Sequence, residues 1–295
     1  MPDISDKNNP MIVPLYQRAA LNVTGDEALD FLNDLLTLNI AQINPHQVLP
    51  TALLTPQGRI LFDLLISQID HGYRLECDIE LLPVLVKKLR LYRMRRQVEI
   101  APCENVVIAA YGAVDGSDWL ADTRFSHAGA EHQAWRRYDK PSAQTSAQTG
   151  ADMMPEHSVE TESYRAARYR LAIAEGAREM PTEKALPLEA RLDDLGAISF
   201  DKGCFIGQEV TARTRYRGLL KRRYVPIRAM TDITVPADIR ADERLAGELL
   251  GLARTGDSWI GLANIRLDAL DSGQTLMAGT NEIIPLTGTE STTKA

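Results

Sequence analysis

Cysteine is scarce in this chain, and long apolar runs are missing. The 295 residues contain three cysteines, Cys77, Cys103 and Cys204, at wide spacing. Such a sparse, odd set excludes the disulfide framework of small secreted domains and indicates free thiols in a reducing compartment. No apolar stretch approaches the roughly 20 residues of a membrane-spanning helix. The polar start, MPDISDKNNP, has the features of neither a secretory signal nor a transit peptide, so we expect a cytoplasmic protein.

Local metal-binding patterns and an excess of positive charge are absent as well. The sequence has no Cys-x-x-Cys and no His-x-x-x-His pair, which argues against a self-contained metal site. A net charge of -7 argues against nucleic acid as the main partner. Basic residues nevertheless gather in a first basic segment, 87–96, and a second basic segment, 213–223. Each is either a solvated face or a binding surface for a small anionic ligand.

Helical and strand periodicities are both present, and we therefore predict the α+β class. Thr24 and Glu27 have the spacing of a capping box, and apolar residues then recur at helical spacing over residues 28–36. Residues 51–68 carry two apolar runs on either side of Pro56-Gln57-Gly58. Because Pro and Gly favour turns, these runs predict a β-hairpin.

The following segments continue this mixed pattern. Alternating apolar residues over 73–80 predict a strand that buries Cys77 in the core. Residues 82–89 predict an amphipathic helix, whose opposite side and C-terminal end carry the first basic segment. A third helix is expected over 161–175, with Gly176 as its stop.

Shifts of composition divide the chain into five parts. We expect an N-terminal α+β part over 1–140 and a flexible insertion over 141–163, where the Ser-Ala-Gln-Thr repeat lies. The α+β core continues over 164–220 and carries the sequence KGCFIGQE. Short apolar stretches separated by Gly, Asp and Pro predict a small β-barrel over 221–286. The tail, 287–295, is expected to be disordered.

The stretch DKGCFIGQEVTARTRYR, residues 201–217, is the most distinctive in the chain. Gly203 and Gly207 permit sharp or closely packed backbone, and a helix is expected to begin near Gly207. Cys204 then precedes a helix N-terminus, where the helix dipole and Lys202 favour a thiolate, the form that acts as a nucleophile or metal ligand. The alternative is an inert buried cysteine between two turn glycines.

The sequence KGCFIGQEVTAR, residues 202–213, resembles the signature of the YgfZ family of folate-binding proteins, which support the maturation or repair of iron-sulfur enzymes. The flanking residues 170–200 and 214–227 are similar as well, and the resemblance covers nearly the whole chain. This family is related in fold to the aminomethyltransferase (T protein) of the glycine cleavage system, which residues 25–40 and 53–66 resemble. The resemblance implies an aminomethyltransferase-like fold, with three domains in a ring around a folate-sized hole.

Two departures from the aminomethyltransferase pattern concern its carboxylates. The transferase has two adjacent aspartates where this chain reads Phe62-Asp63. It also has a Leu-Arg-Leu-Glu whose glutamate bonds the pterin, where this chain has Ala-Ile-Ala at 172–174, and Glu175 replaces that acid only after a shift of register. Because methylene transfer on folate needs a carboxylate near the reacting nitrogens, these losses oppose transferase activity and leave room for binding.

The resemblance implies that Cys204 and Lys202 carry the chemistry and that the cofactor is tetrahydrofolate or a derivative. A folate site needs an apolar cleft with a basic mouth for carboxylates. We expect no bound metal. The residues expected at the folate are Asp63, Tyr92, Arg93, Gly203, Gly207, Gln208, Glu209, Arg213 and Arg215.

Three functions therefore compete. The first is a folate-dependent accessory protein for iron-sulfur protein assembly, maturation or repair, with transient iron-sulfur enzymes or cluster carriers as partners and no membrane or nucleic acid. Support of tRNA modification and a role in oxidative stress belong to this hypothesis. The second is a folate-dependent one-carbon transferase, and the third is a non-catalytic folate-binding scaffold. The motif around Cys204 favours the first, which is not a classical turnover enzyme.

Overall fold

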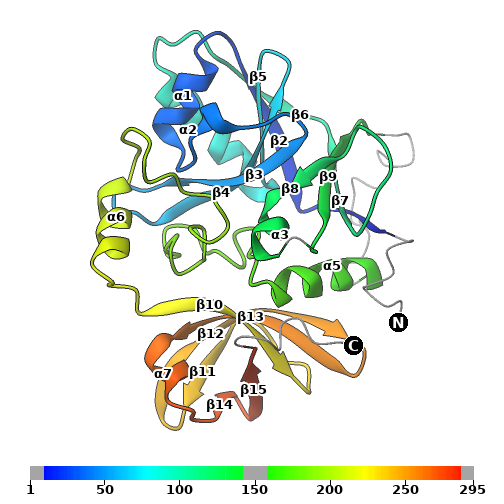
Figure 1. Cartoon of the computed structure of the whole chain (residues 1–295), viewed down its shortest axis with the longest axis vertical. Coiled ribbons are helices and arrows are strands. Elements are labelled where there is room, and N and C mark those ends of the chain that lie inside the picture. The colour runs from blue at the N-terminus through cyan, green and yellow to red at the C-terminus, as the bar shows by residue number, and fades with distance from the viewer. Residues whose placement is uncertain (1–9, 130, 142–157, 287–295) are drawn as a thin grey trace.

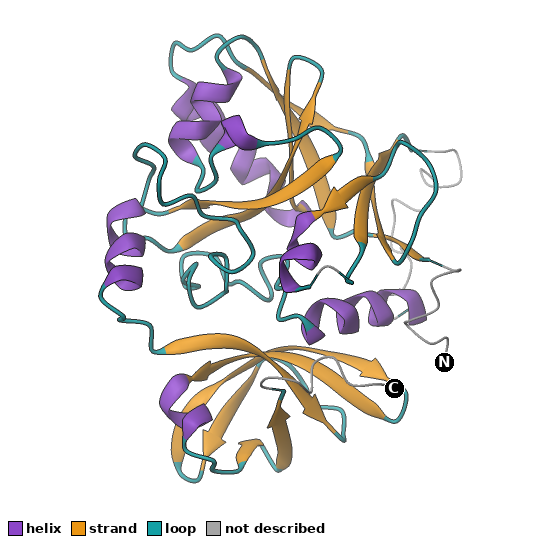
Figure 2. Ribbon diagram, viewed as in Figure 1, coloured by secondary structure: helices purple, strands orange, loops and turns teal. Residues whose placement is uncertain are grey.

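The computed structural model describes residues 10–129, 131–141 and 158–286. These residues form an α+β part built on a nine-stranded sheet and, below it, a closed β-barrel (Figure 1). Helices lie around the strands of both parts, and one of them lies between the two (Figure 2). The predicted insertion lies mostly outside the described residues, as does the predicted tail.

The large sheet has the strand order β1-β7-β9-β8-β3-β4-β5-β2-β6. Its pairings are antiparallel except for that of β3 with β8. Several strands are buried on both faces, and β4 has eight buried residues in succession. The strands are β1 (Met11–Pro14), β2 (Arg18–Thr24), β3 (Gln47–Leu54), β4 (Ile60–Ile69), β5 (Gly72–Asp78), β6 (Glu99–Cys103), β7 (Val106–Tyr111), β8 (Leu120–Asp122) and β9 (Ala134–Asp139).

The predicted hairpin is confirmed as β3 and β4, which pair in antiparallel register around Pro56-Gln57-Gly58. The amide of Gly58 donates to the carbonyl of Thr55 at 2.8 Å, and Gly58 has a φ of +73°. A left-handed residue at this position suits glycine because it has no Cβ. The turn therefore has a fixed shape. The loop that carries Cys204 packs against this turn.

Six described helices accompany the strands, together with two 3-10 turns. Those predicted over 28–36 and 82–89 are confirmed, and each buries its apolar stripe in one core with the sheet. The helices are α1 (Ala28–Leu35), α2 (Leu82–Arg93), α3 (Thr123–Ala128), α5 (Val159–Arg170), α6 (Gln208–Tyr216) and α7 (Leu267–Asp271), with η1 (Ile40–Gln42) and η2 (Ile79–Leu81).

Two local expectations are wrong. The capping box does not form, because Thr24 is the last residue of β2, and the Glu27 carboxylate accepts instead from the amide of Gln97 at 2.6 Å. The third helix is displaced: α5 begins at Val159, inside the predicted insertion, and ends at Arg170 rather than Glu175. A left-handed turn at Ala172, with φ of +53°, follows its end. This turn changes the direction of the chain before Glu175, with consequences for the site.

The C-terminal barrel is confirmed, with the closed strand order β10-β13-β12-β11-β14-β15. Helix α5 packs across β12 and β13, where a Cβ on Gly251 would lie 2.3 Å from the hydroxyl of Tyr169. The missing side chain thus allows close contact between helix and barrel. The strands are β10 (Arg222–Ala229), β11 (Ala237–Ala241), β12 (Arg244–Thr255), β13 (Ser258–Arg266), β14 (Leu276–Ala278) and β15 (Asn281–Pro285).

Candidate functional site

The loop that carries Cys204 joins the sheet part to α6. Cys204 is exposed, whereas Phe205 beside it is buried in the core shared with the barrel. At the start of the loop, the amide of Ser199 donates to the carbonyl of Thr37 at 2.9 Å. Of the chain's three cysteines, Cys77 is buried, as predicted, and Cys103 is half-buried. The buried alternative for Cys204 is therefore wrong, and its thiol can be reached from solvent.

Lys202 binds the end of helix α1. Its Nζ donates to the carbonyls of Asn33 at 2.6 Å and Leu38 at 2.8 Å, and also to that of Leu36. An ammonium has three donors, so these carbonyls use all of them. Burial lowers the pKa of Lys202 to about 8, against the opposing attraction of Asp34. In this geometry Lys202 caps α1 and fixes the loop, and its action on the Cys204 thiol stays a prediction.

Gly207 is the point at which the loop contacts the β3–β4 turn. It is left-handed, with φ of +81°, and a Cβ there would lie 2.5 Å from the Thr55 carbonyl oxygen and 3.0 Å from the Cα of Gly58. Helix α6 begins directly after it, as predicted. Gly203 differs, because a Cβ at that position would meet no atom within 4 Å. Its expected role in close packing is therefore wrong, and Gly207 alone fulfils it.

Helix α6 is largely exposed and carries two arginines of the second basic segment, Arg213 and Arg215. Arg215 stacks on the ring of Phe200, with 4.0 Å between the guanidinium carbon and the ring centroid, so packing fixes the orientation of its side chain. Arg213 is exposed, and its guanidinium makes no hydrogen bond or ion pair with the described residues. Gln208 and Glu209 occupy the first turn of the helix. Among the expected folate contacts on α6, Arg213 is thus the cation available to an anion.

Tyr92 and Arg93 serve helix packing in this structure. Arg93 Nη1 donates to the carbonyl of Val98 at 3.4 Å, next to the similar bond from Arg90 to the carbonyl of Ile100. Tyr92 is half-buried against the core beneath α2. These contacts tie α2 to the segment around β6. They give structural roles to two residues that were expected at the folate.

Asp63 belongs to a buried ion-pair network that the sequence did not reveal. Its Oδ2 accepts from Arg18 Nη1 and from the amide of Gly176, both at 3.1 Å. Arg18 also donates to Glu76 at 2.9 Å. The network unites four buried arginines with five buried carboxylates: Arg18, Arg124, Arg136, Arg168, Asp63, Glu76, Asp122, Glu175 and Glu179.

Glu175 lies at the centre of this network. Burial alone would raise its pKa, but Arg136, Arg124 and Arg168 outweigh burial and hold the pKa well below its usual range. Its Oε2 accepts from Arg124 at 2.8 Å, whereas Oε1 accepts no hydrogen bond from the described residues. Arg18 Nη2 and Arg136 Nη1 likewise donate none. A ligand or water with donor and acceptor groups would satisfy these atoms.

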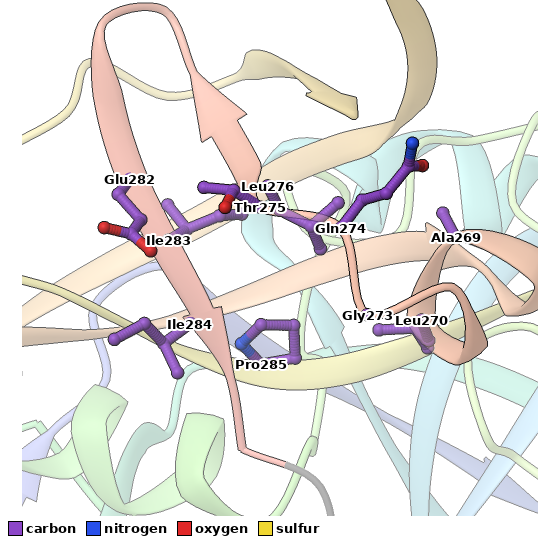
Figure 3. A pocket seen from close by; sticks show the side chains of 10 residues that line it. All are labelled: Ala269, Leu270, Gly273, Gln274, Thr275, Leu276, Glu282, Ile283, Ile284 and Pro285. Carbon is purple, nitrogen blue, oxygen red and sulfur yellow. The ribbon is translucent and has the colours of Figure 1, made fainter. Parts of the chain in front are cut away.

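The hollows by the Cys204 loop and in the barrel are small. One of about 190 Å³ lies between α6 and residues 186–189, where Val210, Thr211 and Thr214 form one wall. Another of about 280 Å³ opens in the barrel between the α7–β14 loop and β15 (Figure 3). Both volumes fall below the range of roughly 300–1,000 Å³ for sites that enclose a drug-sized ligand. Among the described residues, no group of three or more His, Cys, Asp or Glu side chains could hold a metal ion.

Comparisons with known proteins agree on one type of relative. The human mitochondrial iron-sulfur cluster assembly factor IBA57 is 31% identical over 275 residues, which cover 83% of this chain and 74% of the human protein. The mouse protein of the same name is 27% identical over 303 residues, covering 92% and 81% of the two chains. No family profile matches the chain.

A solved structure with the same fold is that of the glycine cleavage system aminomethyltransferase T from Bartonella henselae. Its TM-score is 0.73 at 14% identity, and the match covers 96% of this chain and 86% of that one. At this identity the likeness establishes the fold alone. The predicted relation to the T protein in fold is thereby confirmed.

The expected cytoplasmic location is contradicted, because the relatives bear names that place them in mitochondria. The expectation rested partly on free thiols, which exclude a disulfide framework but do not distinguish one reducing compartment from another. Within the described residues, no helix combines the length and apolar character needed to cross a bilayer.

Proposed function

Because the chain belongs to the family of IBA57-type iron-sulfur cluster assembly factors, we propose that it assists the assembly, maturation or repair of iron-sulfur proteins through Cys204. The exposure of Cys204, in a loop fixed on one side by Lys202 and on the other by Gly207, carries the proposal. A fixed, exposed thiol can meet a sulfur or iron atom that another protein presents. The partners are iron-sulfur enzymes or cluster carriers, bound transiently.

One cysteine cannot hold a cluster alone, since iron-sulfur clusters commonly take four protein ligands. The other two thiols of the chain do not complete such a set. Burial raises the pKa of Cys77 to about 12, and burial also raises the pKa of the half-buried Cys103. Any contact of Cys204 with a cluster is therefore shared with ligands from the partner.

Complementation tests the role of Cys204. In cells that lack the endogenous protein, wild type should restore iron-sulfur enzyme activity under oxidative stress, whereas Cys204→Ser at matched expression should restore less than about a tenth. Because the site is exposed, this substitution should leave the unfolding temperature unchanged within about 1 °C. Cys103→Ser is the control and should restore activity fully. Full rescue by Cys204→Ser would reject the thiol's role and leave the scaffold function.

We further propose that the protein binds a reduced folate, with its pterin ring at the buried ion-pair network. The unsatisfied Glu175 Oε1 can accept from ring N–H groups, and the unsatisfied nitrogens of Arg18 and Arg136 can donate to a ring carbonyl. Bound folate would supply one-carbon chemistry. Arg213 is the exposed cation available for the carboxylates of its tail. Asp63 is already bound by Arg18, so its carboxylate is not free to handle protons, and we expect no methylene transfer.

Calorimetric titration with tetrahydrofolate tests this binding. We expect a saturable signal that weakens at higher salt, because the tail is anionic. Arg213→Ala should reduce the affinity about threefold to tenfold and leave folding intact, since its side chain is exposed. Glu175→Gln should reduce it further, with circular dichroism as the check on folding. No saturable heat at millimolar folate would reject the cofactor without touching the test of Cys204.

A further inference from the structure

Helix α2 presents an unpartnered face at the end of the molecule opposite the barrel (Figure 1). Its inner side, with Leu85, Val86 and Leu89, packs into the core of the sheet part. The outer side faces solvent and carries apolar side chains among its cations. Val84 is 53% exposed, Leu91 72% and Met94, at the C-terminal cap, 83%. These side chains form what is called here the α2 ridge.

The helical geometry sets cations on both sides of this ridge. At about 100° per residue, Val84 and Leu91 lie within about 20° of each other on the helix surface. Lys87 falls about 60° to one side of Val84 and Lys88 about 40° to the other. Arg95 follows Met94 just beyond the end of the helix. An apolar line with cations on both flanks is the arrangement of a helix that lies in a membrane interface.

The six cations of the first basic segment divide into two groups by their contacts. Arg90 and Arg93 donate to main-chain carbonyls, and Arg96 binds the carboxylate of Asp34 at 2.6 Å. The side chains of the other three make no hydrogen bond or ion pair with any described residue: Lys87, Lys88 and Arg95. The Lys88 ammonium does lie over the ring of Tyr92, 5.8 Å from its centroid. The cations that no carboxylate or carbonyl of the described residues binds are thus the ones beside the α2 ridge.

We propose that the α2 ridge and these three cations dock the protein on an anionic lipid surface. The three apolar side chains enter the boundary between headgroups and acyl chains, while the long Lys and Arg side chains reach the phosphates. The charge of -7 on the whole chain repels such a surface elsewhere, so docking occurs with α2 facing the bilayer. This is peripheral contact, which requires no membrane-spanning helix.

A bilayer fits these observations better than a protein or nucleic acid. Exposed apolar side chains in the middle of the face would lie against phosphates on a nucleic acid. A protein partner would need a groove matched to a convex ridge, whereas a bilayer surface accepts a convex ridge of any detailed shape. A bilayer also satisfies cations on both flanks at once, because its charge is continuous.

Vesicle flotation with the whole protein tests the proposal. Wild type should float with phosphatidylcholine vesicles that contain 30% phosphatidylglycerol, and at least fivefold less with pure phosphatidylcholine. Each of Lys87→Glu and Lys88→Glu should lower binding at least fivefold. Leu91→Asp should lower it at least tenfold, and its exposed position leaves folding intact, as a thermal melt would verify.

Leu219→Asp is the matched control, since Leu219 is a half-exposed leucine beside exposed cations on the other basic segment, and it should float like wild type. Insertion of the α2 ridge into the bilayer is measured separately by the tryptophan fluorescence of Leu91→Trp, whose emission maximum should shift to shorter wavelength on anionic vesicles. The emission maximum of Leu219→Trp should not change. No flotation on anionic vesicles would overturn the proposal. Equal losses in the α2 and Leu219 variants would also overturn it, as would binding to an acidic protein without any to vesicles.

Discussion

The side chain of Lys202 caps the C-terminal end of helix α1. Its ammonium donates to the carbonyls of Asn33 and Leu36 at the end of the helix and to that of Leu38 just beyond it, a favourable place for a cation. Lys202→Met keeps most of the side-chain length but removes every donor. We expect this variant to lower the free energy of unfolding by about 2 kcal/mol at pH 7, measured by urea denaturation.

The effect of Lys202 should also depend on pH. Burial lowers its pKa from 10.5 to about 8 in the folded protein. Between these values the unfolded chain binds more protons, so the contribution of Lys202 to the free energy of unfolding rises as pH increases through this window. The difference between wild type and Lys202→Met should therefore widen from pH 8 to pH 10. A constant difference would show that the lysine keeps its ordinary pKa, and a difference that narrows would show a raised pKa; either result would contradict the prediction.

The role of a residue could be predicted where it depends on neighbouring residues in the sequence. It could not be predicted where it depends on main-chain groups far away in the sequence. Alternation placed Cys77 in the core, and the glycine pattern placed the start of α6 at Gly207. The partners of Lys202 are main-chain carbonyls, which every residue type possesses, and they lie 164 to 169 positions away. No sequence pattern marks such acceptors, so a lysine beside a cysteine suggested chemistry where the structure has a helix cap.

At the scale of elements, the contact between α6 and the β3–β4 hairpin fixes the Cys204 loop. Gly207→Ala would force a side chain into the Thr55 carbonyl and hold alanine in a left-handed conformation. We expect it to lower the free energy of unfolding by about 2 kcal/mol and to reduce complementation. Gly203→Ala is the control, because its Cβ meets open space. Equal stability of the two variants in urea denaturation would contradict this packing.

Elements were predicted best where a regular apolar stripe specifies them. Helices α1 and α2 and the β3–β4 hairpin follow from such patterns alone. The end of α5 did not, because its apolar spacing continues through Leu171 and Ala174 while the chain turns at Ala172. Tertiary contacts at residues 173–179 outweigh the helical pattern there: Arg168 binds both the carbonyl of Ile173 and the carboxylate of Glu179.

At the scale of the whole molecule, the buried ion-pair network joins β2, β4, β5, β8 and β9 to α3 and α5. Burial would raise the pKa of Asp122 and of Glu175, but neighbouring arginines outweigh it and lower both. Carboxylates with depressed pKa values stabilise the fold above their unfolded pKa values, about 3.9 and 4.3, and lose that contribution as pH falls through the folded ones. The free energy of unfolding should therefore fall steeply below about pH 4.

Glu175→Gln separates the network from the general charge of the chain. The substitution removes one titrating group, and three buried arginines lose the negative charge that balances their own. The free energy of unfolding at pH 7 should therefore fall by about 3 kcal/mol. The decline below pH 4 should be shallower than in wild type. Denaturant titrations at pH 7, 5, 4 and 3 provide the measurement. Parallel curves for the two proteins would show that Glu175 contributes nothing to acid sensitivity.

The architecture was predictable from resemblance, and the network was not. The motif at 202–213 and its flanks indicated the aminomethyltransferase-like fold before any geometry was known. The members of the network are single charges scattered over strands, such as Arg18 and Glu76, 58 positions apart. A charged residue on a strand predicts a solvent-facing position, because burying it is costly without a partner. Only the three-dimensional meeting of these strands supplies the partners.

The cap on α1 also constrains the order in which the protein can mature during synthesis. The carbonyls at the end of α1 leave the ribosome long before Lys202, which follows Leu38 by 164 positions. At translation rates of about 5–20 residues per second, that interval is on the order of 8 to 30 seconds. Throughout it the nascent N-terminal domain lacks the donor that completes its first helix. Completion of the first helix is therefore tied to emergence of the same loop that carries Cys204.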